Sequence, residues 1–378
     1  MLEKFELLSV FANGINHRVA FVKEGRNSTV DSTTPLIMLL HGWPEGWYCW
    51  RHQLLALHNA GYHNVCAPDM RGFGGTDAPT AVDDYTIDIV CRDVIEIAKA
   101  VGGGYQRIVV VGHDFGAYLA WHLALLHPSN VVAVCAMSVP YVGHSPRNEP
   151  LLTKLQTNYG KCLPRAPYFA TRDEQLQARF NYILHHNLPY ADQEYDKNCE
   201  EFLYRIYGYQ RGRVEADPPE VTSKLMFLPA PTTTTTSKST LMNAKTAPGW
   251  WTRIPRPTKL PPWLPHTDFQ ILVKEYQTHK FAGGLKWYQA MEANWYQTLC
   301  LRGKCIEPPS LFVCGDEDMV LKTHGGKDVV QKALQNNCAD LRGVIFVRGA
   351  GHWIQQQCAT KVNEVLLEFL QSLPNSKL

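Results

Sequence analysis

Short apolar runs alternate along the chain with longer stretches of helical periodicity. Strand-like runs within residues 34–40, 63–77 and 108–111 are each followed by a helix-like segment. Alternation of this kind predicts a mainly parallel sheet covered by helices on both faces. Ahead of these runs, residues 5–25 contain two strand-like runs joined at Asn13-Gly14, a dipeptide typical of a tight β-hairpin turn.

The pattern changes in the middle of the chain. Residues 140–298 contain aromatic, helix-like segments without evident strands, and strand-like runs then return. We therefore expect a core domain from residues 1–139 and 299–378, interrupted by a helical cap over 140–298. Within the cap, a Pro/Thr-rich stretch near 217–265 lacks apolar periodicity and is interpreted as a surface excursion. The chain closes on a helix-like segment with one apolar face, made by Val362, Val365, Leu366, Phe369 and Leu370.

One stretch of the core carries distinctive chemistry, "VVVGHDFGAYLAWHLALL" at residues 109–126. It predicts a buried strand, a sharp turn and a buried helix, with Asp114 between Gly112 and Gly116 at the turn. This spacing is that of a nucleophile elbow, which usually carries serine. A carboxylate is already charged at neutral pH, so it does not need a histidine to remove a proton from it. It can attack a strained or activated carbon bearing a leaving group, which gives an alkyl ester on the enzyme.

Such an ester needs water, and the water needs a base. His352 follows the strand-like run "GVIFVRGAG", and Asp316, Glu317 and Asp318 follow "SLFVCG". Catalytic groups in parallel sheets gather at the carboxyl ends of the strands, so we expect a nucleophile, an acid and a base in that chain order to converge. The pattern alone leaves open which carboxylate orients the histidine.

A third feature is the loop "HGWP", residues 41–44, which directly follows an early strand. We expect this loop to turn a backbone N–H, that of Trp43, towards the elbow. Together with the N–H of Phe115 it would bind the oxyanion that forms when water attacks the ester. Trp43, Phe115 and Trp353 are also expected to contact the substrate.

Taken together, the segments "HGWPEGWYCWRHQ", "PDMRGFGGTDAP", "GHDFGA", "GDED" and "GHW" resemble the epoxide hydrolases of the α/β-hydrolase fold. The resemblance extends from about residue 16 to residue 370. It implies that Asp114 is the nucleophile and His352 the base. The orienting acid is the second aspartate of the family's GDxD pattern, which is Asp318 here, and Asp316 is the less favoured candidate.

The resemblance also implies two cap tyrosines that protonate the departing alkoxide. The segment "GGLKWYQAMEANW" closely matches one family motif and assigns Tyr288. The other motif, Y-x-x-x-F-Q, matches "YILHHN" and assigns Tyr182, but His186 and Asn187 stand where the family has Phe and Gln. This departure predicts an altered pocket beside Tyr182.

The amino-acid composition mainly excludes certain classes of function. The 378 residues carry 37 basic and 35 acidic side chains, a formal charge of +2, which gives no basic surplus for nucleic acid or an anionic membrane. Eleven cysteines without CxxC spacing indicate reduced thiols, and we expect a cytoplasmic protein without a signal peptide or membrane span. No motif implies a cofactor or a metal ion. The expected partners are water and a small apolar epoxide.

Two other interpretations remain open from the sequence. A haloalkane or haloacid dehalogenase shares the aspartate, histidine and ester chemistry, but such enzymes commonly carry Trp directly after the nucleophile, where this chain has Phe115. A ligand-binding protein of the same fold would be expected to have lost at least one catalytic residue. All five, Asp114, Tyr182, Tyr288, Asp318 and His352, are present.

Overall fold

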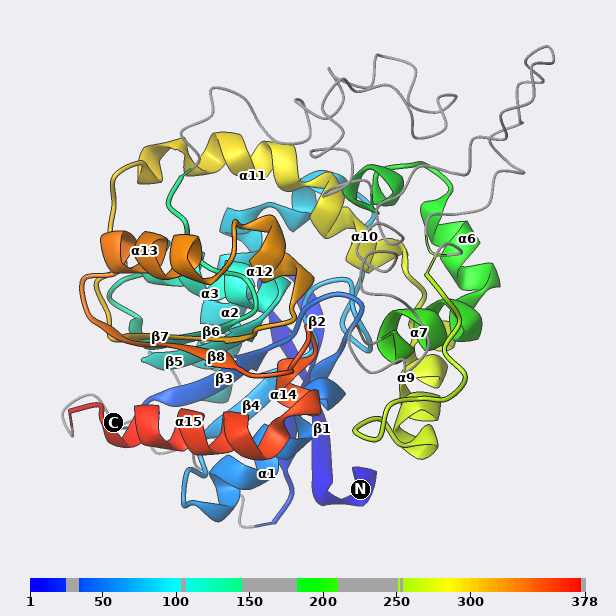
Figure 1. Cartoon of the computed structure of the whole chain (residues 1–378), viewed down its shortest axis with the longest axis horizontal. Helices are drawn as coiled ribbons and strands as arrows, with labels where there is room; N and C mark the ends of the chain where they lie inside the picture. Colours follow the sequence, from blue (N-terminus) through cyan, green and yellow to red (C-terminus); the bar gives the residue numbers. More distant parts are fainter. Residues whose placement is uncertain (25–33, 103–106, 145–181, 210–250, 252–253, 375–378) are drawn as a thin grey trace. The chain divides into compact units, whose positions relative to one another are not determined.

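The computed structural model describes residues 1–24, 34–102, 107–144, 182–209, 251 and 254–374. It divides into two compact units, one formed by Met1–Ser145 with Gln297–Leu378 and the other by Pro146–Tyr296. Figure 1 labels their elements. Most of the Pro/Thr-rich stretch, residues 217–250, lies outside the described residues. None of the helices in these ranges is both long enough and apolar enough to cross a bilayer.

The first unit is built on an eight-stranded sheet with the order β1-β2-β4-β3-β5-β6-β7-β8. Strand β2 runs antiparallel to both of its neighbours, and every other pair is parallel. The strands are β1 (Phe5–Ala12), β2 (Ile15–Val22), β3 (Leu36–Leu40), β4 (Val65–Pro68), β5 (Ile108–His113), β6 (Val131–Met137), β7 (Ser310–Gly315) and β8 (Leu341–Val347).

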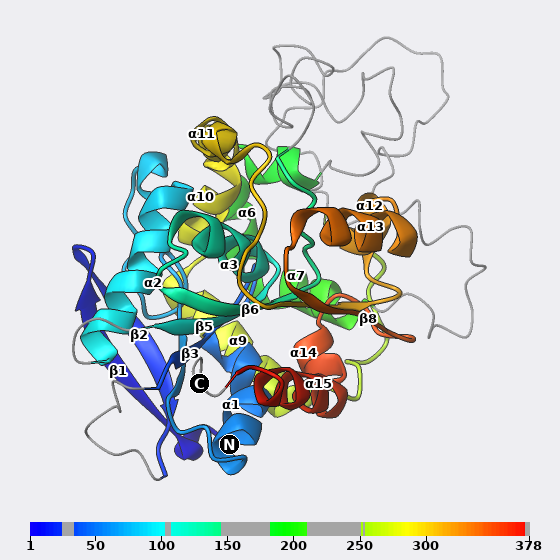
Figure 2. The same ribbon diagram turned by 90° about the vertical axis from the view of Figure 1, so that its left-hand side faces the viewer.

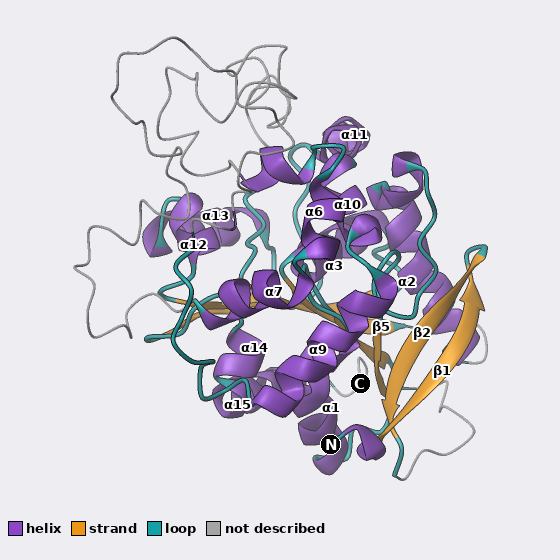
Figure 3. Cartoon of the chain, turned by 90° about the vertical axis from the view of Figure 1, so that its right-hand side faces the viewer, coloured by secondary structure: helices purple, strands orange, loops and turns teal. Residues whose placement is uncertain are grey.

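The predicted hairpin is present at the edge of this sheet, where β1 and β2 pair along their full length (Figure 3). Asn13 and Gly14 form its two-residue turn, with φ of 47° and 83°. Two successive positive φ angles are what a type I′ turn requires, which explains why Asn-Gly stands there.

Helices cover both faces of the sheet, as the alternating pattern predicts (Figure 2). The helices α2 (Ile87–Val101), α3 (Phe115–Leu126), α12 (Met319–Thr323) and α13 (Lys327–Asn337) lie on one face. The other face carries α1 (Arg51–Asn59), α14 (Ile354–Gln357) and α15 (Ala359–Gln371). Short 3-10 helices, η1 (Leu2–Lys4), η2 (Trp47–Trp50), η3 (Val82–Tyr85) and η5 (Thr298–Leu301), complete the unit.

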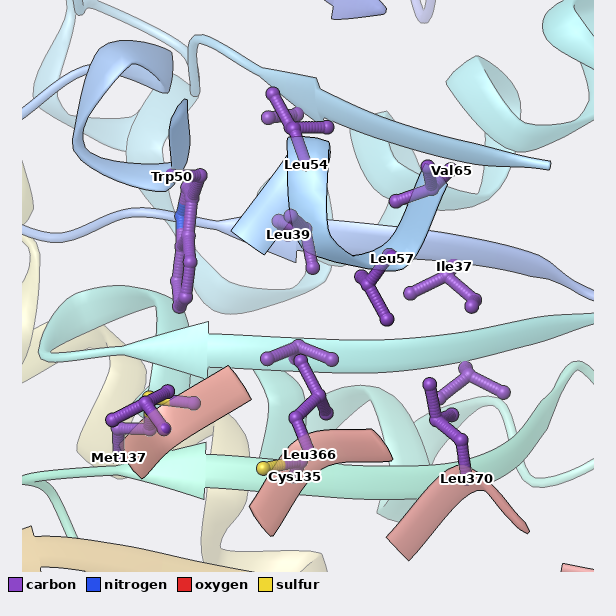
Figure 4. Packing of buried hydrophobic residues seen from close by; sticks show 14 of the residues in the cluster. Ile37, Leu39, Trp50, Leu54, Leu57, Val65, Cys135, Met137, Leu366 and Leu370 are labelled. Atoms are coloured by element: carbon purple, nitrogen blue, oxygen red, sulfur yellow. The ribbon is translucent and has the colours of Figure 1, made fainter. Parts of the chain in front are cut away.

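A large apolar core fills the space between the sheet and helices α1 and α15 (Figure 4). Leu54 and Leu57 from α1 pack with Leu366 and Leu370 from α15 against the side chains of the central strands. The apolar face predicted for the last helix is confirmed, because all five of its residues are buried. This core fixes the strand ends from which the site is built.

The described part of the second unit contains helices and no strand. They are the helical residues 182–186, α6 (Ala191–Lys197), α7 (Cys199–Gly208), α9 (His266–His279), α10 (Ala282–Gln289) and α11 (Met291–Gln297), the last of which ends at the boundary between the units. Aromatic side chains form much of its interior, with Tyr195 stacked on Phe202 and Tyr276 stacked on Phe281. A mainly parallel sheet interrupted by a helical insert is the fold class that the sequence predicts.

Candidate active site

Asp114 occupies a strained turn between β5 and α3. Its φ of 53° and ψ of −117° lie outside the regions that L-residues usually adopt. The flanking glycines are required by close packing. A Cβ on Gly112 would lie 2.1 Å from the carbonyl oxygen of Gly116, and one on Gly116 would lie 2.0 Å from that of Leu40. The turn therefore projects the carboxylate at the carboxyl end of β5, as a nucleophile elbow does.

The structure brings Asp114, Asp318 and His352 together in the first unit. The Nε2 atom of His352 lies 3.6 Å from Oδ2 of Asp114. On the other side of the ring, Nδ1 lies 3.1 Å from both carboxylate oxygens of Asp318. Asp318 is fully buried, whereas the side chains of His352 and Asp114 remain 21% and 17% exposed. The imidazole thus stands between a sheltered carboxylate that orients it and a more accessible one.

The two aspartates of the GDED segment have different surroundings. Asp318 caps α12 by accepting the N–H of Val320 at 2.8 Å. Asp316 accepts the N–H of Gly349 at 2.7 Å and forms an ion pair with Lys327. The geometry therefore places Asp318 against the histidine and ties Asp316 to a neighbouring loop.

The three groups shift one another's pKa values. Burial alone would lower the pKa of His352, but the charge of Asp318 and the hydrogen bonds to both aspartates outweigh it, so that the pKa lies well above its usual value. Burial raises the pKa of Asp114, yet its hydrogen bond to His352 and the charge on that ring leave it below the usual value. The same balance lowers the pKa of Asp318. The arrangement keeps both carboxylates charged.

The expected oxyanion loop lies beside Asp114. The backbone N–H of Trp43 donates to Oδ1 of Asp114 at 3.0 Å. Close approach is possible because residue 42 is glycine, whose Cβ would lie 2.3 Å from that of Asp114. Phe115 is the first residue of α3, and the N–H groups of a helix's first turn point out of its N-terminus. The ring of Trp353 packs against His352, with 4.8 Å between the ring centroids.

Sequence reasoning missed a buried pair behind the site, Glu45 and His113. The Nδ1 atom of His113 lies 2.7 Å from Oε2 of Glu45, and its Nε2 lies 2.8 Å from the backbone carbonyl oxygen of His352. Glu45 also accepts the N–H of Gly42 at 3.1 Å. Both side chains are fully buried. The pair joins the HGWP loop, the elbow and the loop of His352.

The charge state of this pair follows from its hydrogen bonds. A carbonyl oxygen cannot donate, so Nε2 of His113 carries a proton. Burial raises the pKa of Glu45, but the neighbouring His113 outweighs it and leaves that pKa below its usual value. Glu45 is therefore a carboxylate, which accepts hydrogen bonds from the His113 ring and from Gly42. The sequence carries one signal for this pair. An ionisable residue stands in each of "HGWPE" and "GHD", and both segments are otherwise expected to be buried.

The two predicted tyrosines lie in the second unit. Tyr182 comes from the helical residues 182–186 and Tyr288 from α10. Their ring centroids are 6.2 Å apart and the rings are nearly perpendicular, at 87°. The structure thus brings together two tyrosines that are 106 positions apart along the chain. Elsewhere, no three His, Cys, Asp or Glu side chains of the described residues are placed to hold a metal ion.

Comparisons with known proteins agree with this geometry. The model of the alpha/beta hydrolase family matches residues 37–365. Epoxide hydrolase A of Mycobacterium tuberculosis is 34% identical, with 96% of this chain and 97% of the relative covered. Epoxide hydrolase 3 of Siraitia grosvenorii is 27% identical over 98% of this chain and 99% of its own length.

Solved structures give the same result. Epoxide hydrolase A of Mycobacterium thermoresistibile has a TM-score of 0.78 at 31% identity, covering 98% of this chain and 99% of that one. An epoxide hydrolase of Vigna radiata has a TM-score of 0.72 at 27% identity, with the same coverage. The resemblance expected from the sequence motifs is therefore confirmed, and the chain belongs to the alpha/beta hydrolase family as a relative of the epoxide hydrolases.

Proposed function

We propose that this chain is an epoxide hydrolase, which converts an epoxide and water into a vicinal diol through an ester on Asp114. The observation that carries the proposal is the placement of a carboxylate at the nucleophile elbow, 3.6 Å from a histidine that a second, buried carboxylate orients. Full-length relatives named epoxide hydrolases support it.

In the first step, a carboxylate oxygen of Asp114 attacks an epoxide carbon and the carbon–oxygen bond of the ring breaks. Because Oδ1 accepts the N–H of Trp43, Oδ2 is the oxygen expected to attack. The departing alkoxide is far more basic than a phenolate, so it needs a proton donor. We assign that role to Tyr182 and Tyr288.

In the second step, His352 removes a proton from water and the water oxygen attacks Cγ of the ester. Negative charge develops on Oδ1, where the N–H groups of Trp43 and Phe115 stabilise it. Asp318 stabilises the imidazolium that forms and keeps the ring oriented. The bond between Cγ and Oδ2 then breaks, and the leaving alkoxide takes the proton of the new carboxylic acid, so that Asp114 is again a carboxylate. The proton on His352 restores the ionised tyrosine, and the diol leaves with the oxygen that came from Asp114.

The pKa shifts couple the two steps. In the free enzyme, the charge of Asp114 helps to hold the pKa of His352 above its usual value. Formation of the ester removes that charge, so the pKa of His352 falls and the ring can release its proton to solvent. The histidine therefore becomes a base when the ester needs one.

The proposed substrate is small and mainly apolar, because the second unit is rich in aromatic side chains. We also propose a reducing, intracellular location, since ten cysteines of the described residues are free thiols and seven of these are buried.

A single turnover in ¹⁸O-labelled water tests the mechanism. With excess enzyme, the first diol should contain no label, while the peptide that holds Asp114 should gain one labelled oxygen. Label in the first diol would contradict the ester and indicate direct attack of water on the epoxide. Turnover of haloalkanes alone, with halide release, would instead assign the protein to the dehalogenases.

A further inference from the structure

His186 is a buried imidazole that contacts both proposed proton donors. Its ring centroid lies 4.3 Å from that of Tyr288 and 5.6 Å from that of Tyr182. Both contacts are edge-to-face, with interplanar angles of 61° and 72°. Since the two tyrosine rings also contact each other, the three rings form one cluster.

Local structure explains why these rings meet. Tyr182 and His186 are four residues apart in a helical segment, so they lie on the same face one turn apart. Tyr288 comes from α10, far along the chain. His186 therefore links the segment that holds one tyrosine to the helix that holds the other.

The imidazole is uncharged at neutral pH. His186 is 0% exposed, and burial, with a smaller contribution from the neighbouring His185, lowers its pKa well below the usual value. A neutral imidazole still carries one N–H donor and one nitrogen acceptor, which a phenyl ring of similar size lacks. The family pattern has Phe at this position, so this chain places a polar ring where an apolar one would fill the same space.

We propose that His186 is a positioning residue for the proton donors, a polar ring that fixes Tyr182 and Tyr288 relative to each other and supports the loss of a proton from their hydroxyl groups. This inference rests on the proposed function. His186 acts through the tyrosines, because its own side chain is 0% exposed and contacts both of their rings. In edge-to-face pairs the positive edge of one ring meets the negative face of the other, so a dipolar neighbour responds to charge that develops on a phenol.

Measuring two rates distinguishes a positioning role of His186 from a role in packing alone. Rapid mixing with styrene oxide, followed by quenching, gives the rate at which Asp114 is alkylated and the rate at which the ester is hydrolysed. His186→Phe keeps an aromatic ring of similar size but removes its polarity. We expect this variant to alkylate Asp114 about tenfold more slowly, while ester hydrolysis changes less than twofold because His352 and Asp318 are untouched. A general loss of structure would lower both rates.

His186→Gln restores a donor and an acceptor and should recover part of the alkylation rate, which also provides a second variant if the Phe variant folds poorly. His185→Phe is the matched control. His185 is the adjacent buried histidine, but its ring contacts Tyr190 and Tyr195 and it pairs with Glu194. The His185→Phe variant should therefore alkylate Asp114 at the wild-type rate.

If His186→Phe alkylates Asp114 at the wild-type rate, the inference is overturned and His186 is a packing residue. If His185→Phe slows alkylation as much as His186→Phe does, the inference is also overturned, because the loss of rate would then come from a less stable helix. If the wild-type protein forms no adduct on Asp114, the proposed function itself fails and the inference falls with it.

Discussion

The Nε2 atom of His113 lies 2.8 Å from the backbone carbonyl oxygen of His352. The residue that precedes the nucleophile thus holds the loop that carries the base. Its other ring nitrogen is bound by Glu45, which also accepts an N–H from the loop that supplies Trp43. One buried ion pair therefore sets the mutual positions of the nucleophile, the base and the oxyanion loop.

Removing the charge of Glu45 should lower both the stability of the fold and the rate of catalysis. Glu45→Gln leaves the buried His113 without its charged partner, which is expected to cost on the order of 3 kcal/mol in the free energy of unfolding. Urea denaturation measures the change. Glu317→Gln is the control, because Glu317 is exposed and pairs with Lys322 at the surface, where the loss should stay below about 1 kcal/mol. Equal stabilities of the two variants would contradict a structural role for the pair.

Substitutions of the two aspartates in the GDED segment should have very different effects on ester hydrolysis. Asp318→Asn keeps the shape of the side chain but removes the charge that orients His352, so ester hydrolysis should fall by about a thousandfold or more. Asp316→Asn should change it less than about threefold, since Asp316 bonds Gly349 and Lys327 instead. Quenched-flow measurement of the ester separates hydrolysis from alkylation. A larger loss in Asp316→Asn would reverse the assignment.

Tyr288→Phe should slow formation of the ester without slowing its hydrolysis. Loss of one donor to a developing oxyanion typically removes about 3 kcal/mol of transition-state stabilisation, roughly a hundredfold in rate. Tyr182→Phe should act on the same step. Tyr204→Phe is a matched control, because Tyr204 lies in the same unit and packs on Phe269. Normal single-turnover alkylation in Tyr288→Phe would remove that residue from the mechanism.

Replacing Asp114 with a neutral isostere should lower the pKa of His352. Asp114→Asn imitates the loss of charge on ester formation and leaves only Asp318 to raise that pKa. NMR titration of the His352 ring measures the change, with Asp316→Asn as the control. A His352 pKa that is the same in Asp114→Asn as in the wild type would contradict the proposed coupling between the two steps.

The same shift predicts how stability depends on pH. The folded-state pKa of His352 is raised above the unfolded value of about 6.5. Its pairing therefore contributes fully below that pH, and the contribution is lost as the pH rises through the folded-state pKa. In Asp114→Asn that loss should be complete at lower pH than in the wild type, because the folded-state pKa is lower. Urea denaturation across this range tests the direction.

The sequence predicts much of this architecture because its signals are local. Asn13-Gly14 specifies the hairpin turn, and the spacing of Gly112, Asp114 and Gly116 specifies the elbow, whose φ of 53° the structure confirms. Strand order is not a local property, so the placement of β4 between β2 and β3 could not be derived from the chain.

The same limit explains what was missed in the site. The pairing of Glu45 with His113 joins residues 68 positions apart, and their burial becomes evident only when the loops are assembled. The choice between Asp316 and Asp318 likewise needed the resemblance, because both follow the same strand and only three-dimensional placement separates them. The sequence shows that His186 departs from the family pattern, but its contact with Tyr288 depends on how α10 packs.

Mass spectrometry of His352→Gln after brief exposure to a panel of small epoxides and haloalkanes tests the central claim most directly. Removal of the base should stall the second step, so that an adduct with the full mass of the epoxide accumulates on the peptide that contains Asp114. The same variant with Asp114→Asn added should form no adduct. An adduct only from haloalkanes, or no adduct from any compound, would contradict the account of this chain as an epoxide hydrolase.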